Sequence, residues 1–173
     1  MYVCFGQGYN FYFGNIHAHS GYSDGNKDSL TSGMYTPYQD FLYANESEQI
    51  DFYGISEHNH SAAGMASKQN YYNGIADAEL ATIEDTFIAL YGMEWGIISQ
   101  GGHVLIYGYD SLIGWDNNLY DEYVQPTDFH GLWNVINSKL NCFGYLAHPQ
   151  AADFDSLLIK PWDFNADQAV VGM

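Results

Sequence analysis

The chain has 173 residues, of which 47% are hydrophobic and 17% aromatic, a composition typical of one globular domain and not of a disordered segment. It carries 21 acidic and 4 basic residues, all four of them lysines, for a formal net charge of -17. Because polyanion binding draws its affinity from Lys and Arg, this balance argues against nucleic acid and anionic membranes as partners. No apolar run approaches the ~20 residues of a membrane span. The composition leans towards an extracytoplasmic location, and the oligomeric state stays open.

The first predicted element is an apolar run, residues 11–14, which has the pattern of a buried strand and leads into a histidine pair. Side chains at i and i+2 of a strand share a face, so His17 and His19 can aim two imidazoles at one point. Asp24 follows after a short turn and could add a carboxylate. Two imidazoles and a carboxylate suit a divalent metal. An isolated His-x-His also occurs as two surface histidines beside a loop.

Apolar runs farther along the chain repeat this arrangement. Three of them end in metal-ligand side chains, and a fourth begins with one. In chain order these side chains are Glu57 with His58, Glu94, His103, and His148. Chance would scatter such residues among helices, loops and strand interiors, so their recurrence predicts a metal site.

Segments of helical or turn character separate the apolar runs. The predicted helices are 37–48, 75–83 and 128–140. Asp128 is the expected N-cap of the last helix, residues 110–123 are expected to form a loop, and residues 169–173 a sixth strand. Continuous apolar strands joined by such connections predict a parallel sheet covered by helices. Folds of this class gather their active-site residues at the carboxyl ends of the strands.

Taken in order, the motifs resemble those of the PHP (polymerase and histidinol phosphatase) superfamily. The matching pieces are His-Ala-His-Ser (17–20), Ser-Asp-Gly (23–25), Gly-Ile-Ser-Glu-His-Asn (54–59), Gly-Met-Glu (92–94), Gly-His-Val-Leu-Ile-Tyr-Gly (102–108) and Leu-Ala-His-Pro (146–149). The Ser-Glu-His-Asn form is similar to the CehA/McbA-like branch. The resemblance covers about residues 11–149 and implies an α/β fold, a distorted (β/α)7 PHP-type barrel.

The resemblance also implies two or three divalent metal ions, commonly zinc, manganese or iron. It assigns His17 and His19 to the first metal, Asp24 and His58 to the second, Glu94 to a bridge, and His103 with His148 to the third. Glu57 completes the candidate metal ligands, although this family position more often stands behind a ligand. The candidate catalytic residues are Glu94, Asp24 and His148.

The family's barrel closes with an Asp-x-His motif, which this sequence does not contain after His148. The resemblance therefore implies a single PHP-like domain over residues 1–173 that is incomplete at its C-terminal end and stops before its last strand motif.

The expected function is that of a metal-dependent phosphoesterase that cleaves a small phosphate ester through hydroxide held by the metal. Without arginine, the metals themselves must neutralise a phosphoryl group, and this favours a small-molecule ester over a polynucleotide. Two alternatives stay open. One is hydrolysis of a carbamate or amide on the same site, and the other is a non-catalytic metal- or glycan-binding module of a larger secreted protein.

Two further histidines lie outside the matched motif positions. His60 forms a second His-x-His with His58, and it is interpreted either as a loop histidine or as an outer ligand or substrate contact. His130 falls at the start of a predicted helix and is interpreted as structural or solvated.

Overall fold

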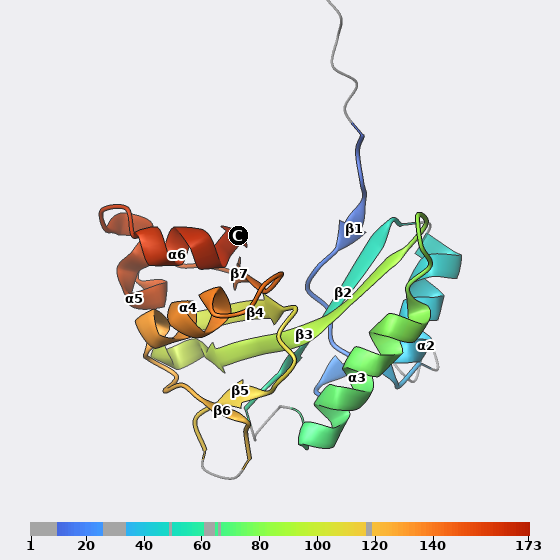
Figure 1. Cartoon of the computed structure of the whole chain (residues 1–173), viewed down its shortest axis with the longest axis horizontal. Coiled ribbons are helices and arrows are strands. Elements are labelled where there is room, and N and C mark those ends of the chain that lie inside the picture. The colour runs from blue at the N-terminus through green and yellow to red at the C-terminus, as the bar shows by residue number, and fades with distance from the viewer. Residues whose placement is uncertain (1–9, 26–33, 49, 61–64, 66, 117–118) are drawn as a thin grey trace, which may run out of the picture.

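The structure is a computed structural model that describes residues 10–25, 34–48, 50–60, 65, 67–116 and 119–173. Within these residues, the chain forms a mixed α/β fold around a curled sheet of six strands in the order β1-β2-β3-β4-β7-β8 (Figure 1). The strands are β1 (Gly14–Asn15), β2 (Phe52–His58), β3 (Ile88–Ile97), β4 (Gly102–Tyr107), β7 (Phe143–Ala147) and β8 (Val170–Gly172). A separate two-stranded sheet pairs β5 (Ile113–Gly114) with β6 (Glu122–Tyr123).

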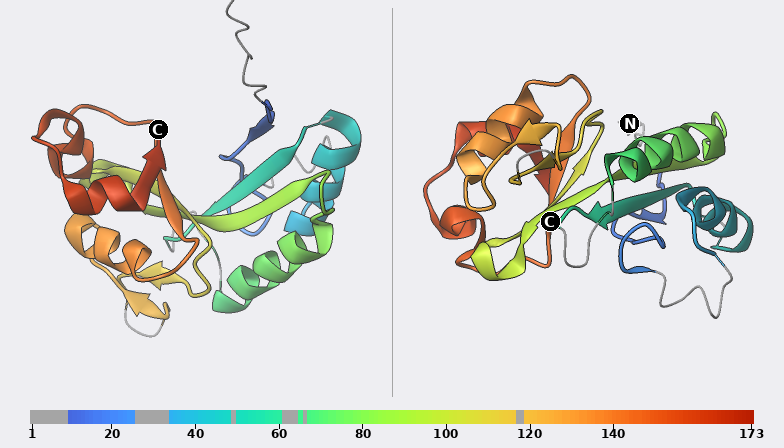
Figure 2. Two further views of the ribbon diagram at one scale, coloured as in Figure 1. Left: turned by 45° about the horizontal axis from the view of Figure 1, so that its top comes forward. Right: turned by 90° about the horizontal axis from the view of Figure 1, so that it is seen from below.

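Helices cover the outer, convex side of the curled sheet, and the C-terminus lies at one rim of the inner, concave side (Figure 2, left). They are α2 (Pro37–Tyr43), α3 (Lys68–Ala81), α4 (Phe129–Asn137), α5 (Asp153–Ser156) and α6 (Phe164–Ala169). A π-helical turn, Ala44–Glu48, extends α2. In the part of the chain that the structure describes, none of these helices has the length and apolar character to span a bilayer.

The prediction of a (β/α)7 barrel with a parallel sheet is wrong. Strand β4 runs antiparallel to both of its neighbours, β3 and β7, so the described residues form a mixed half-barrel. The cause is the connection between β3 and β4, a single 3₁₀ turn over Ile98–Gln100 followed by Gly101 at φ 118°. A parallel strand needs a crossover of about a dozen residues or more, which so short a turn cannot supply.

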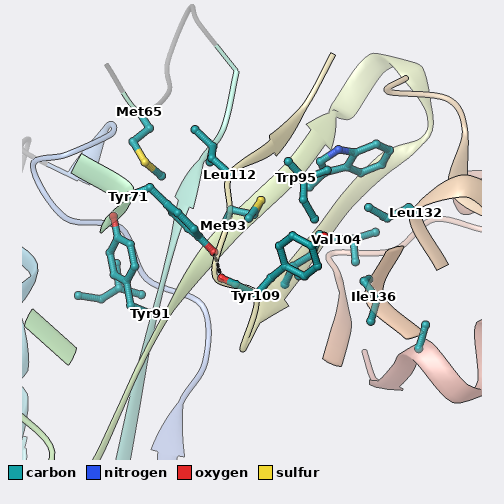
Figure 3. Close-up of a cluster of buried hydrophobic side chains, with 14 of the residues drawn as sticks. Met65, Tyr71, Tyr91, Met93, Trp95, Val104, Tyr109, Leu112, Leu132 and Ile136 are labelled. Atoms are coloured by element: carbon teal, nitrogen blue, oxygen red, sulfur yellow. Dashed lines mark hydrogen bonds between the residues drawn. The ribbon is translucent and has the colours of Figure 1, made fainter. Parts of the chain in front are cut away.

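Alternation along the strands separates two apolar layers. Met93 and Trp95 of β3 point towards the helices, and this main core is drawn in Figure 3. Between them, Glu94 points to the opposite, inner side. The inner side has a smaller apolar cluster built on Leu105 and Tyr107. Glu94 therefore stands on the concave face of the half-barrel and not in the layer that the helices cover.

Two predicted helices are present in the structure, and the N-cap predicted for one of them is confirmed. The helix predicted at 128–140 is α4, and the Asp128 side chain accepts a hydrogen bond from Gly131 N at 2.8 Å, as expected for an N-cap. The helix predicted at 37–48 is α2 with its π-helical turn, capped by Thr36 and Gln39 in a capping box.

Other predicted elements differ in extent. The helix predicted at 75–83 begins earlier, at Lys68. The predicted loop 110–123 contains β5 and β6, and the predicted last strand is β8. The prediction of a buried strand at residues 11–14 is wrong, because Phe11 is 78% exposed and β1 is limited to Gly14–Asn15. Pairing with β2 begins only at Gly14, opposite Phe52.

Candidate metal centre

The direction of β4 brings its first residues to the same edge of the sheet as the last residues of β2 and β7. His58 is the final residue of β2 and lies opposite Glu94 of β3 in the strand register. His103 of β4 lies opposite Ala147, the last residue of β7, and His148 follows directly. The antiparallel strand thus explains why its histidine precedes the apolar run while the others follow theirs.

The segment after β1 brings two more histidines to this edge. Its backbone stays beside β2, because Ser56 N donates to Ala18 O at 2.8 Å. His17 and His19 flank Ala18 and both reach the inner side of the sheet, where their ring centroids are 5.3 Å apart. The His-x-His spacing therefore delivers two imidazoles to one point, although the segment lies beyond the end of β1.

Five imidazoles surround the carboxylate of Glu94, which is 1% exposed. The distances from its oxygens to the nearest ring nitrogen are 2.6 Å for His103 Nδ1, 3.1 Å for His19 Nε2, 3.1 Å for His148 Nε2, 3.2 Å for His17 Nε2 and 3.2 Å for His58 Nδ1. The structure therefore brings together on one carboxylate five imidazoles from four separate segments of the chain.

The carboxylate of Asp24 stands on the outer side of this cluster. Its oxygens lie 3.8 Å from His19 Nδ1 and 3.9 Å from His58 Nε2. Three overlapping groups, each with its ligand atoms within 4.8 Å of one another, could hold a metal ion: His17–His19–Glu94, His19–Asp24–His58, and His58–Glu94–His103. His148 joins none of the three groups but contacts Glu94.

The hydrogen bonding of the cluster suits a cation. Three buried ring nitrogens, His58 Nδ1 and both nitrogens of His103, make no hydrogen bond of regular geometry within the described residues, although the two Nδ1 atoms contact the Glu94 carboxylate. Buried polar atoms in folded proteins almost always have a partner, and neutral imidazole nitrogen is a common metal ligand. A cation among these nitrogens would satisfy them, so the donor set fits a metal ion.

Burial raises the pKa of Glu94, but the contacts with His103, His17 and His19 outweigh it and hold that pKa well below its usual range. The carboxylate is therefore ionised near pH 7. In this form it can act only as an acceptor or as a metal ligand.

This environment shifts the pKa of His58 and the pKa of His19 in opposite directions. Burial lowers the pKa of His58 to about 4, so its ring is neutral near pH 7 and has a lone pair free for a metal. At His19, burial lowers the pKa, but the hydrogen bond with Glu94 and the charge of Glu94 raise it above its ordinary value overall. A bound cation would replace the proton at this position.

Glu57, a candidate ligand in the sequence, lies outside the three ligand groups of the described residues. It precedes His58 on β2, and successive side chains of a strand point to opposite faces. Its fully buried carboxylate accepts hydrogen bonds from Ser20 N at 3.1 Å and from the hydroxyls of Ser20 and Ser23. Glu57 thus fixes the turn that presents Asp24 to the cluster.

The sequence reasoning did not identify three residues that support the ligands, Ser20, Ser23 and Asn59. The Asn59 side chain donates to Ile113 O at 2.7 Å and accepts from Gly96 N at 3.4 Å, and the residue is 1% exposed. Each of these residues stands within or beside a recognised motif. Their positions in the motifs could have identified them as supporting residues, because polar residues next to metal ligands often orient those ligands.

A scan against protein-family models found no match for this chain, and a search of curated proteins found none either. The site is thus defined by its geometry, as a buried cluster of His and Glu side chains that could hold a metal ion.

Proposed function

We propose that the chain is a metal-dependent hydrolase, a phosphoesterase that cleaves small phosphate esters on two or three divalent ions such as zinc, manganese or iron. The observation that carries the proposal is the convergence of five imidazoles on the buried carboxylate of Glu94. The resemblance of the ordered motifs to the PHP superfamily supports the same reaction class.

The three ligand groups indicate which residues would hold the ions. His17, His19 and Glu94 would hold one, and His19, Asp24 and His58 would hold a neighbour. His103 with Glu94 and His58 would hold a third. Because a neutral imidazole has one free lone pair, His19 and His58 would each ligate one ion at a time, so these overlapping groups are alternatives at those two residues. When bound, divalent cations lower the pKa of a coordinated water and neutralise charge on a phosphoryl oxygen. Histidine nitrogens and carboxylate oxygens are ligands for zinc, manganese and iron alike.

The protein's own residues would position and admit the substrate. Glu94 stays ionised and orients the imidazoles around it, and Glu57 fixes the turn that carries Asp24. The side chains of His148 and Asp24 are 45% and 38% exposed, whereas that of Glu94 is 1% exposed. The cluster is therefore open to solvent on the side of His148 and Asp24, and a substrate would approach there.

The charge of the chain argues for a small substrate. With a net charge of -17 and no arginine, the protein repels an extended polyanion. The cations at the site would supply a local attraction for a phosphoryl group, and a local attraction suits a single ester.

The test is the metal content of the purified protein together with its turnover of p-nitrophenyl phosphate, bis-p-nitrophenyl phosphate and a panel of carbamates and amides. We expect two or three metal equivalents, ester turnover that chelation abolishes, and recovery when zinc or manganese is restored. His148→Ala should lower turnover strongly. The matched exposed histidine on α4, changed in His130→Ala, should leave it unchanged.

Other outcomes would overturn the proposal in defined ways. Turnover of carbamates or amides alone would reassign the substrate to that class. Bound metal without turnover of any ester or amide would favour a non-catalytic metal-binding module, and a protein that binds no divalent ion would remove the basis of the proposal.

A further inference from the structure

His60 lies beside the metal centre but belongs to none of its ligand groups. It stands two residues after His58, and the two ring centroids are 5.2 Å apart. The side chain is half-buried and makes no hydrogen bond or ion pair within the described residues. Its ring nitrogens are therefore available to a ligand that enters the site.

The backbone around His60 is fixed by the residue before it. Asn59 N donates to Glu94 O at 3.3 Å, and the Tyr120 hydroxyl donates to Asn59 O. The side chain of Asn59 is bonded at both ends, to Ile113 and Gly96. These four hydrogen bonds tie the backbone before His60 to β3 and to the β5–β6 segment. The backbone that leads into His60 is therefore held in place, unlike that of a histidine in an open loop.

The lysines of the described residues are occupied elsewhere. Three lysines form ion pairs with aspartates, namely Lys68 with Asp121 at 3.0 Å, Lys139 with Asp110 at 3.0 Å, and Lys160 with Asp155 at 2.6 Å. Lys27 lies outside the described residues, and the chain has no arginine. Apart from His60 and the exposed His130 on α4, every histidine contacts Glu94.

We propose that His60 is a substrate-positioning residue that donates a ring N–H to a phosphoryl oxygen of the bound ester. This inference rests on the phosphoesterase function proposed above. A phosphoryl group held by cations on one side still has oxygens that need hydrogen-bond donors, and a hydrogen bond to a charged oxygen is stronger than a neutral one. His60 stands next to the ligand His58, follows a residue whose backbone is held by hydrogen bonds, and has no hydrogen-bond partner within the described residues.

The test compares His60→Ala and His60→Asn with wild-type protein and with His130→Ala, all loaded with the same metal. Three quantities are measured: the metal equivalents bound, the dissociation constant for inorganic phosphate by calorimetry, and KM and kcat for p-nitrophenyl phosphate. His60→Ala should weaken phosphate binding and raise KM by about tenfold to a hundredfold, with metal equivalents unchanged. His60→Asn keeps a side-chain N–H and should recover part of the loss, while His130→Ala should match wild type.

The outcomes separate this inference from the proposed function. Loss of a metal equivalent in His60→Ala would make His60 a ligand, and unchanged phosphate binding would make it a bystander, so either result overturns the inference alone. If wild-type protein loaded with metal neither binds phosphate nor hydrolyses an ester, the phosphoesterase proposal fails, and the role of His60 fails with it.

Discussion

His58 and Glu94 lie directly opposite each other in the register of the parallel strands β2 and β3, and 3.2 Å separates His58 Nδ1 from Glu94 Oε2. Register fixes this contact, because paired residues of neighbouring strands point to the same face. The adjacent pair, Glu57 and Met93, points to the other face. One residue along β2 therefore separates His58, a candidate ligand, from Glu57, which supports the turn that leads to Asp24.

Replacing Glu94 with glutamine should abolish metal binding at the centre of the cluster. Glutamine has nearly the same shape but is neutral, so five imidazoles would lose the one anion they share. We expect the loss of at least one metal equivalent and a fall in ester turnover of more than ~100-fold. Elemental analysis of the purified variant and initial rates on p-nitrophenyl phosphate would measure both.

Glu84 supplies the matched control for this change. It is an exposed glutamate in the turn before β3, and Glu84→Gln should bind metal and turn over the ester as wild type does. Full metal content in Glu94→Gln would contradict a ligand role for Glu94.

Glu57→Gln should affect metal binding differently from Glu94→Gln. Glu57 accepts three hydrogen bonds from Ser20 and Ser23 and supports the turn that leads to Asp24, but it lies outside the ligand groups. Loss of such a support typically costs 10- to 100-fold in metal affinity, so we expect weaker binding with the full number of metals at saturation. Titration of the metal-free protein measures affinity and number together, and a lower number at saturation would show that Glu57 is itself a ligand.

The ligand residues other than Asp24 could be predicted because each stands where an apolar run of the sequence begins or ends. His17, His58 and His148 needed no knowledge of the fold for this, since strand ends gather in one place in most α/β sheets. The role of Glu57, as a ligand or as a support for the ligands, was harder to predict. Strand alternation places Glu57 and His58 on opposite faces, but a sequence does not show where a strand stops alternating and becomes loop.

The direction of β4 was the main error in the predicted fold. An apolar run reads the same in a parallel and an antiparallel strand, so residues 104–107 carry no sign of their direction. The informative feature was the short connection at residues 98–101, which is too brief for a crossover. The run at residues 11–14 was predicted to be a buried strand from its composition alone. A strand also needs a partner, and pairing with β2 begins only at Gly14.

Asp40→Asn should stabilise the protein at high pH and have no effect at low pH. Burial and the charge of Glu57 raise the pKa of Asp40 from 3.8 to about 7. The folded state therefore holds this proton more tightly than the unfolded state, and the stability of the wild type falls as pH rises from about 4 to 7. The carboxyl is partly open to water, which screens its charge, so we expect Asp40→Asn to gain roughly 1–2 kcal/mol at pH 8.

Urea denaturation at pH 4.5, 6 and 8 would measure this difference. Asp167→Asn is the matched control, because Asp167 stands in the first turn of α6 as Asp40 does in α2 and is exposed. Both changes remove a negative charge near a helix N-terminus. A gain in Asp40→Asn that does not depend on pH would contradict the raised pKa as its cause.

Gly74→Ala should destabilise the protein although alanine is the better helix former. Gly74 lies in the middle of α3, where alanine would by itself gain about 1 kcal/mol. A Cβ at this position, however, would lie 2.0 Å from Cζ of Tyr91, whose ring is 6% exposed and packs against Tyr71. Helix α3 would have to move away from β3, and overpacking of this kind costs roughly 1–3 kcal/mol net. A melting temperature about 4–10 °C lower is expected.

Glu79→Ala on the exposed side of α3 should leave the melting temperature nearly unchanged. In a Tyr91→Leu background the cost of Gly74→Ala should shrink, because the ring that opposes the methyl group is gone. An equal cost in both backgrounds would place the strain somewhere other than this contact.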